Sequence, residues 1–324
     1  MNVVCDAAQF VDGSDANYTF INYKPGEARD HPVLAAGNVS APGAVVPRRF
    51  LAVLAREDHR FTRGSGRLDL AERIFSDAAP LASRVIVNRV WAWHFGKPLV
   101  ATPSDFGTQG EKPTHPELLD DLAARFVRNG WSLKWLHREI MLSEAYRRSS
   151  RPRKDALAAD AANSLLWRMN PRRLDIESYR DTLLRVSGRL NPELYGPSED
   201  ADSETSVRRT VYARASRSRP AKLPQLYDFP DATQTSPGRD LTTSALQSLF
   251  VLNSSFMKLA AEGVARQPAG ADGDAARVRE LFRRILARDP TAKELDSALS
   301  YLARGSLESY ARILLSCNEV IFWP

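Results

Sequence analysis

From residue 66 onward, apolar side chains recur at the spacing that marks one face of a helix. The first strong helix is expected to follow Pro80, because proline's missing N–H would be unpaired in a first helical turn in any case. Gly96 stands where a helix C-terminal cap belongs. The apolar stripe of this helix comprises Leu81, Val85, Trp91 and Phe95.

The same spacing predicts further helices towards the end of the chain. Ser132 can cap one of them, and Thr291-Ala-Lys-Glu294 has the pattern of a capping box, in which two residues satisfy each other's backbone donors. The expected helices lie within residues 115–130, 132–140, 172–188, 243–265, 278–285, 291–302 and 306–317. Together these elements predict the all-α class and a mainly helical, bundle-like domain.

Residues 1–65 follow a different pattern. They are rich in Gly, Pro, Asp and Asn, with β-leaning pieces such as Tyr18-Thr-Phe-Ile21 and turn signals at 24–26 and 41–43. We therefore predict an irregular, β-leaning N-terminal arm or linker remnant over residues 1–65 and a helical domain over 66–324. Within that domain, residues 196–206 are predicted to form a mobile polar loop. Residues 207–213 are predicted to be a small β-leaning segment.

The composition is that of an ordinary globular protein, with 324 residues, 43% apolar and 26% charged. No stretch approaches the roughly 20 apolar residues of a membrane-spanning helix, and the start of the chain lacks the basic and apolar regions of a signal peptide. The formal net charge is +6. Acidic side chains are interleaved with the basic ones, whereas nucleic-acid-binding proteins concentrate cations on one stripe, so the pattern disfavours nucleic acid as a partner.

Arginine greatly outnumbers lysine in this chain. Genomic base composition would produce such a bias without any function, and this interpretation is favoured. The functional alternative is that many Arg forks bind carboxylates in a bidentate manner, either inside the fold or at a site.

The chain has two cysteines, Cys5 and Cys317. Neither belongs to a Cys-x-x-Cys or Cys-x-x-Cys-His motif, so we predict no c-type haem and no cysteine-ligated zinc. No other cofactor is predicted in this chain. Two free thiols are favoured over a Cys5–Cys317 disulfide.

The densest polar cluster lies on the helix that follows Pro80. Arg84 and Asn88 are one turn apart on an otherwise apolar helix, and buried polar groups must be paired, since an unpaired one costs roughly 1–3 kcal/mol. Their partners are the loop at 102–110, the start of the helix at 172, or a ligand. The candidate binding pocket comprises Arg84, Asn88, Arg89, His94, Asp105 and His115.

No metal site is predicted. No two histidines have the spacing that places two ligands on one helix face. A composite site of His94, Asp105 and His115 would require the loop to fold back, and spacing supports it only weakly. His94 is expected to be a satisfied, partly buried histidine, and His115 a structural helix cap.

A second cluster lies within residues 172–188. Glu177 and Asp181 are four residues apart and share a helix face with cations, an arrangement more typical of an ion-pair network than of a general acid and base. This cluster is the expected supporting shell of the pocket. It comprises Arg172, Arg173, Glu177, Arg180 and Asp181.

Many short motifs over residues 65–324 resemble one known family. The first are Arg84-Val-Ile-Val-Asn-Arg-Val-Trp91, His94-Phe-Gly96, Thr102-Pro-Ser-Asp-Phe-Gly107 and Thr114-His-Pro-Glu-Leu-Leu-Asp120. Later ones are Asn163-x-x-Leu166-Trp-Arg-Met-Asn170, Glu177-x-x-Arg180-Asp181, Ser187-Gly188 and Arg208-Arg209. Together they resemble the planctomycete domain of unknown function 1553, the C-terminal domain of cytochrome-c-associated proteins. Two positions depart from the family pattern, at Gly96-Lys97-Pro98-Leu99 and at Asp121.

The resemblance implies the C-terminal domain of a larger exported protein at the periplasm or cell envelope. It implies a haem-bearing domain or protein as a partner, and a role in redox work or polysaccharide handling. A non-catalytic binding or interaction module is the leading hypothesis. The alternative is a hydrolase acting on an anionic polysaccharide, whose sulfate and carboxylate groups suit Arg forks; nucleic-acid binding ranks third.

Overall fold

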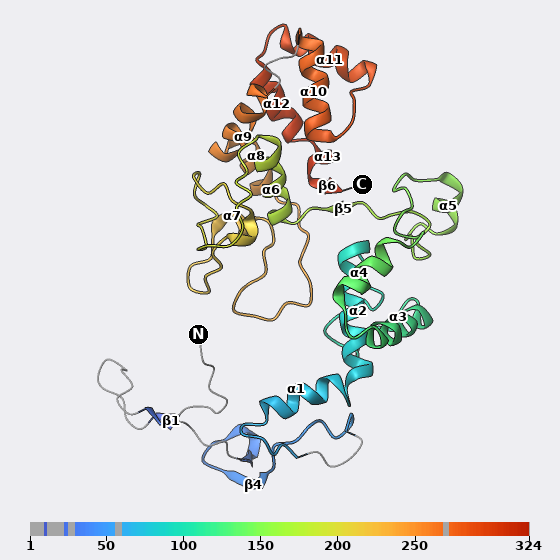
Figure 1. The fold of residues 1–324 in the computed structure, drawn as a ribbon, viewed down its shortest axis with the longest axis vertical. Coiled ribbons are helices and arrows are strands. Elements are labelled where there is room, and N and C mark those ends of the chain that lie inside the picture. Colours follow the sequence, from blue (N-terminus) through green and yellow to red (C-terminus); the bar gives the residue numbers. More distant parts are fainter. Residues whose placement is uncertain (1–9, 12–22, 25–29, 56–59, 268–271, 324) are drawn as a thin grey trace. The chain divides into compact units, whose positions relative to one another are not determined.

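The computed structural model describes residues 10–11, 23–24, 30–55, 60–267 and 272–323 (Figure 1). These residues are mainly helical, which confirms the predicted all-α class. The chain divides into two compact units at the peptide between Leu142 and Ser143. The predicted boundary between residues 65 and 66 stays a prediction, although helix α1 (Arg67–Phe75) does begin next to it.

Short antiparallel strand pairs precede the helices of the first unit. Strand β1 (Phe10–Val11) pairs with β2 (Tyr23–Lys24). Strand β3 (His31–Leu34) pairs with β4 (Pro42–Val46), and the 3-10 turn η1 (Ala35–Gly37) lies between them. The β-leaning character predicted for the arm is thus present, but the piece at 18–21 lies outside the described residues.

The helical part of the first unit is organised around α2 (Ala79–Phe95). This helix packs against α1, α3 (Pro116–Arg128) and α4 (Leu133–Met141). Gly96 ends α2 with φ 75°, a left-handed conformation that glycine adopts without strain, and the hydroxyl of Ser132 accepts a hydrogen bond from the Trp135 amide to cap α4. Both predicted caps are confirmed.

The buried face of α2 is rotated from the predicted stripe. Leu81 is exposed and Val85 only half-buried. The buried side chains of the helix include Val87, Asn88, Val90, Trp91 and Phe95. The stripe was misplaced because a polar residue, Asn88, occupies the centre of the true core face.

The second unit holds the remaining helices. They are α5 (Lys154–Ala159), α6 (Ile176–Val186), α7 (Lys222–Leu226), α8 (Ala245–Asn253), α9 (Ser255–Arg266), α10 (Asp274–Leu286), α11 (Ala292–Leu302), α12 (Leu307–Leu315) and α13 (Asn318–Ile321). Strand β5 (Arg172–Arg173) pairs antiparallel with β6 (Phe322–Trp323). The core of this unit joins side chains from α6, α9, α10 and α12, among them Leu183, Met257, Leu281 and Leu315.

Two predicted helices in this unit have different limits. The helix expected over 172–188 begins only at Ile176, because the Asp175 carboxylate caps it by accepting from the Ser178 amide at 2.8 Å. The helix expected over 243–265 is two helices. Ser254 has extended backbone between α8 and α9, and its hydroxyl accepts from the Met257 amide at 3.2 Å. In both cases a capping side chain interrupts a continuous apolar pattern.

The polar segment at 196–206 is tied into the fold by backbone hydrogen bonds. The Glu199 amide donates to the Tyr212 carbonyl at 2.9 Å, and the Arg214 amide donates to the Glu199 carbonyl at 2.8 Å. The β-leaning prediction for 207–213 needs correction. This stretch makes isolated bridges at Arg208 and Ala213 and contains the 3-10 helix η2 (Thr210–Tyr212) instead of a strand.

Two further expectations concern membrane spans and thiols. Within the described ranges, no helix combines the length and hydrophobicity that crossing a bilayer requires. Cys317 is a half-buried free thiol. Cys5 lies outside the described residues, so its state stays a prediction.

The capping box of α11 makes a testable prediction about acid stability. Thr291 and Glu294 cap each other as expected, and the Glu294 carboxylate is also held by the fork of Arg288 at 2.7 and 2.9 Å. These contacts lower the pKa of Glu294 from 4.5 to about 2. Because the folded-state pKa is the lower one, this carboxylate stabilises the fold above about pH 4.5, and the contribution is lost as the pH falls towards 2.

We therefore expect Glu294→Gln to be less stable than wild type at neutral pH and to lose less stability on acidification. Melting temperatures followed by circular dichroism from about pH 6 to about pH 2.5 measure both effects. Glu144→Gln is the matched control, because Glu144 is exposed and forms no ion pair among the described residues. Parallel pH profiles for wild type and Glu294→Gln would contradict the assignment.

Candidate functional site

Arg84 joins two helices of the first unit. Its Nε donates to Asp120 Oδ1 of α3 at 2.7 Å, and its Nη1 donates to the Pro80 carbonyl at 2.9 Å. The bond from Arg84 lowers the pKa of the Asp120 carboxyl. Arg84 therefore has partners inside the fold, and its main role there is to fasten α2 to α3.

Asn88 is completely buried and satisfied by one backbone residue. Its amide nitrogen donates to the Val100 carbonyl at 3.0 Å, and its carbonyl oxygen accepts from the Val100 amide at 2.8 Å. The Asn88 side chain thus makes the two hydrogen bonds to Val100 that a neighbouring β-strand would make, and it fixes the segment that follows α2. Arg89, its neighbour, is half-buried, and its Nε has no hydrogen-bond partner among the described residues.

His94 lies beside a histidine that the sequence did not suggest as a partner. Its Nε2 is 2.8 Å from Nδ1 of His137 on α4, and the two rings meet edge to face. His94 is half-buried, as expected. The pairing carried no local signal, because the two histidines belong to different helices.

Asp105 and His115 make local contacts. The Asp105 carboxylate accepts from the Gly107 amide at 2.8 Å, and the Asp105 carbonyl accepts from the Thr102 hydroxyl at 2.8 Å. His115 occupies the N-cap position of α3, as expected, but its ring bonds to the Thr114 hydroxyl at 3.0 Å and not to a helix amide. These residues shape the connection between α2 and α3.

The composite metal site that residue spacing supported only weakly is not formed by the described residues. Among the residues that the structure describes, no three His, Cys, Asp or Glu side chains come together in a way that could hold a metal ion, so His94, Asp105 and His115 do not form such a group. The pocket candidates also belong to the first unit, whereas the expected shell residues belong to the second.

Within the second unit, the ion pairs differ from those expected. The Glu177 carboxylate accepts hydrogen bonds from both terminal nitrogens of Arg239 at 2.6 Å. The Asp181 carboxylate accepts one from the Thr210 amide at 2.6 Å. Glu177 and Asp181 are therefore paired, as the network interpretation predicted. Their partners come from distant loops, and not from Arg173 and Arg180.

Arg173 points towards α8. Its Nη2 donates to Gln247 Oε1 at 2.8 Å, and its Nη1 donates to the Thr242 carbonyl. The guanidinium also lies over the Tyr227 ring, 5.5 Å from the ring centroid. The backbone of Arg172 and Arg173 is fixed by pairing with β6.

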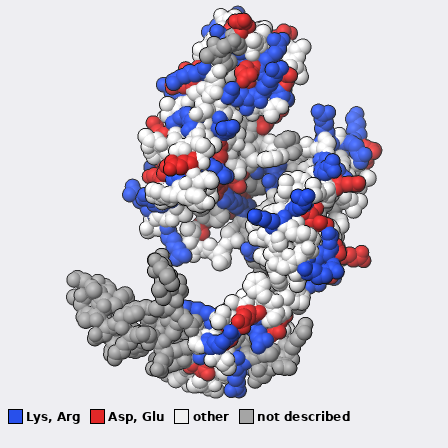
Figure 2. Space-filling model, in the orientation of Figure 1, with Lys and Arg blue, Asp and Glu red and all other residues white. Residues whose placement is uncertain are grey.

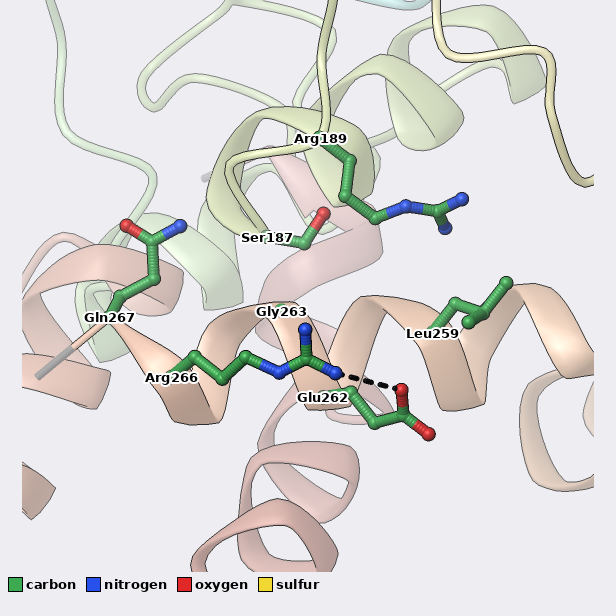
Figure 3. A pocket seen from close by; sticks show the side chains of 7 residues that line it. All are labelled: Ser187, Arg189, Leu259, Glu262, Gly263, Arg266 and Gln267. Atoms are coloured by element: carbon green, nitrogen blue, oxygen red, sulfur yellow. Dashed lines mark hydrogen bonds and ion pairs between the residues drawn. The ribbon is translucent and has the colours of Figure 1, made fainter. Parts of the chain in front are cut away.

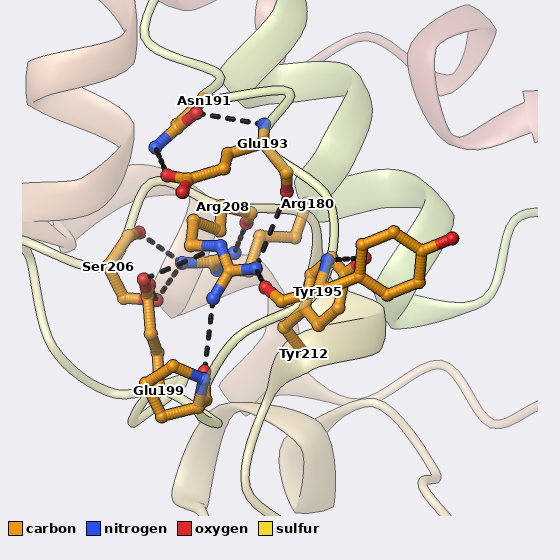
Figure 4. Close-up of polar contacts among 9 residues, drawn as sticks. Arg180, Asn191, Glu193, Tyr195, Glu199, Ser206, Arg208 and Tyr212 are labelled. Atoms are coloured by element: carbon orange, nitrogen blue, oxygen red, sulfur yellow. Dashed lines mark hydrogen bonds and ion pairs between the residues drawn. The ribbon is translucent and has the colours of Figure 1, made fainter.

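Arg180 is almost completely buried, with 2% of its surface exposed. Its Nη1 donates to the Arg208 carbonyl at 3.2 Å and to the Thr210 hydroxyl at 3.1 Å. Its Nη2 donates to the carbonyl and hydroxyl of Ser206 (Figure 4). Burial lowers the pKa of the guanidinium. Neutral oxygens thus pair both terminal nitrogens of a buried cation and hold the 206–210 segment against α6, whereas Nε has no hydrogen-bond partner among the described residues.

Arg208 likewise donates hydrogen bonds to backbone carbonyls of a neighbouring loop. Its Nη1 donates to the Pro197 carbonyl at 3.0 Å, its Nη2 donates to the Tyr195 carbonyl, and its guanidinium lies 4.1 Å from the centroid of the Tyr212 ring. Glu199 is the nearby carboxylate, with its Oε1 3.9 Å from Nε. Arg180 and Arg208 together organise residues 193–213 (Figure 4).

Two of the cavities among the described residues lie in the second unit. The larger, of about 510 Å³, is lined by the end of α6 and by α9 (Figure 3). The smaller, of about 280 Å³, is lined by Arg173, by tyrosines and by residues near the C-terminus. Of the candidate residues, only Arg173 lines either cavity. The sequence did not assign the other lining residues to a site, although Ser187 belongs to a family motif and Cys317 was expected to be a free thiol, because their contacts are tertiary.

A family model described as "Protein of unknown function (DUF1553)", with the short name PSD1, matches residues 66–302. Comparisons with curated proteins and with solved structures find no match. The family finding agrees with the resemblance in the sequence, and it assigns no activity, substrate or partner.

The buried contacts of Asn88 make a prediction about stability. Asn88→Ala leaves the amide and carbonyl of Val100 without partners, which we expect to lower the free energy of unfolding by about 2 kcal/mol or more. Asn129→Ala is the control, since Asn129 is exposed and its side chain makes one hydrogen bond among the described residues, to the Arg125 carbonyl. We expect the control to lose about 0.5 kcal/mol or less in urea denaturation. Equal losses in the two variants would show that Asn88 does not fasten the segment at Val100.

Proposed function

This chain belongs to the DUF1553 family of proteins of unknown function, and from that premise we propose that it is a non-catalytic binding module for an anionic polysaccharide. The binding site is the larger cavity, where α6 ends beside α9. The planctomycete envelope setting and the haem-bearing partner implied by the sequence resemblance belong to the same proposal.

The observation that carries the proposal is the state of Arg189 at this cavity. Its Nη2 donates to the Glu204 carbonyl at 3.0 Å, whereas its Nη1 is buried without a hydrogen-bond partner among the described residues. One side of the guanidinium is therefore anchored, and the other has an unused donor. A sulfate or carboxylate oxygen would supply the missing acceptor, and charge-assisted bonds of this kind are the strong ones.

Further donors line the same cavity. Arg266 is highly exposed and pairs with Glu262 at 3.3 Å, a surface contact that a ligand can replace at little cost. The side-chain oxygen of Gln267 accepts a hydrogen bond from Arg284 at 2.8 Å. The side-chain nitrogen of Gln267 is thus left to donate elsewhere (Figure 3). The cavity thus offers two guanidinium groups and one carboxylate.

The same lining favours binding over hydrolysis. Glycoside hydrolysis commonly uses two facing carboxyl groups. Among the described residues that line this cavity, Glu262 is the one carboxylate, and it is paired with Arg266. Glu262 would therefore balance charge at the site.

The surface charges favour a local anion site over a nucleic-acid groove. Figure 2 shows acidic and basic side chains interspersed over the face in view, without a continuous basic stripe. Nucleic-acid binding would draw on such a stripe to replace many counterions at once.

The test is calorimetric titration of the full chain with a sulfated oligosaccharide, a polygalacturonate oligosaccharide and a neutral dextran oligosaccharide. We expect the anionic glycans to bind and dextran not to bind. Arg189→Met should weaken binding about tenfold or more, since it removes a charge-assisted donor pair. Arg185→Met is the matched control, because exposed Arg185 lies on α6 but does not line the cavity.

Arg266→Met gives a second test if Arg189→Met folds poorly. Equal losses for Arg185→Met and Arg189→Met would contradict a local site and point to general charge attraction. Absence of binding to both anionic glycans would overturn the proposal, and shorter glycan products after incubation would support a hydrolase instead.

A further inference from the structure

The smaller cavity of the second unit is a different kind of site. It lies among α6, α8 and the C-terminal segment that contains α13 and β6. Apolar side chains supply part of its wall, including Val251, Leu252, Ile321 and Phe322. Its volume of about 280 Å³ suits a molecule of about one ring with a short side chain.

Two buried tyrosines face this apolar wall. Tyr179 is 2% exposed, and its hydroxyl forms no hydrogen bond among the described residues; the Tyr227 hydroxyl reaches the Gln247 carbonyl only at 3.5 Å. Buried tyrosine hydroxyls usually have a partner. Burial raises the pKa of Tyr227 to about 12 and that of Tyr179 further, so both hydroxyls are neutral donors at physiological pH.

The charge of the cavity comes from Arg173. Its hydrogen-bond partners are neutral, the Thr242 carbonyl and the Gln247 side chain, and the described residues that line the cavity include no carboxylate. A cation without an anion, close to an unused hydroxyl donor, favours an acidic ligand. The apolar wall favours an apolar body behind the acidic group.

We propose that this cavity binds a small carboxylic acid with an aromatic or other apolar body. The carboxylate accepts a hydrogen bond from the Tyr179 hydroxyl and lies in the field of Arg173, while the body packs against Val251 and Ile321. Arg173 itself is held in place by Gln247, the Tyr227 ring and the β5–β6 pair. The site is therefore built before any ligand arrives.

Cys317 provides a reporter, because it is one of the residues that line the cavity. In a Cys5→Ser background Cys317 is the remaining cysteine, so its rate of reaction with a thiol reagent measures access to the cavity. The probes are phenylacetate, its uncharged analogue phenylacetamide, and acetate. We expect phenylacetate to protect Cys317 in a saturable manner, and the other two to protect it much less.

Tyr179→Phe removes the proposed donor and keeps the ring. We expect it to weaken phenylacetate binding about tenfold, the effect of losing a hydrogen bond to a charged group. Tyr310→Phe is the matched control, since Tyr310 is a buried tyrosine of the same unit that does not line the cavity. Calorimetry on the same proteins gives the affinities without the thiol reagent.

Three results would overturn the proposal. They are equal protection by phenylacetate and phenylacetamide, binding that leaves the Cys317 rate unchanged, and equal affinities for wild type and Tyr179→Phe. Glycan binding at the larger cavity is measured with the same variant. Because Tyr179 does not line that cavity, failure of one proposal is distinguishable from failure of the other.

Discussion

The second unit depends on one buried cation, the guanidinium of Arg180. Charged groups are expensive to bury unless their hydrogen-bonding capacity is met. Here the two terminal nitrogens donate to neutral oxygens of Ser206, Arg208 and Thr210, which belong to a segment with little regular structure of its own. The 206–210 segment and α6 therefore stabilise each other, since the segment supplies acceptors for Arg180 and Arg180 holds the segment in place.

This interaction matters because α6 contributes to both cavities. Tyr179, one residue before Arg180, lines the smaller cavity, and Ser187 at the end of α6 lines the larger. Close packing holds the far end in place: a Cβ atom on Gly263 would lie 2.6 Å from the Ser187 carbonyl oxygen. A helix fixed in its middle by Arg180 and at its end by α9 sets the shape of both proposed binding sites.

Local signals in the sequence were sufficient where the controlling contact is itself local. Gly96, Ser132 and the Thr291–Glu294 box each cap a helix through neighbouring residues, and each prediction is confirmed. The start of α6 was predicted too early because the Asp175 cap and the β5–β6 pairing override a helix-compatible pattern. At Arg172 and Arg173, the strand pairing with Phe322 and Trp323 overrides the local helix propensity.

The candidate site could be predicted only in part. The sequence identified Arg84 and Asn88 as polar residues that require partners and placed Arg180 in the expected supporting shell, and all three have partners. It could not identify the partners Asp120, Val100 and Ser206, because these residues come close to Arg84, Asn88 and Arg180 only in the folded chain. The pairing of His94 with His137 and the meeting of Tyr179 with Cys317 at one cavity depend in the same way on chain topology.

The most direct test of this account is hydrogen exchange at the amides of Glu199, Thr210 and Arg214 in Arg180→Met. The Glu199 amide donates to the Tyr212 carbonyl, the Arg214 amide to the Glu199 carbonyl, and the Thr210 amide to the Asp181 carboxylate on α6. We expect their exchange to accelerate about tenfold or more relative to amides of α10, with no such change in Arg185→Met. Unchanged protection of these three amides in Arg180→Met would contradict the claim that the buried guanidinium organises the segment.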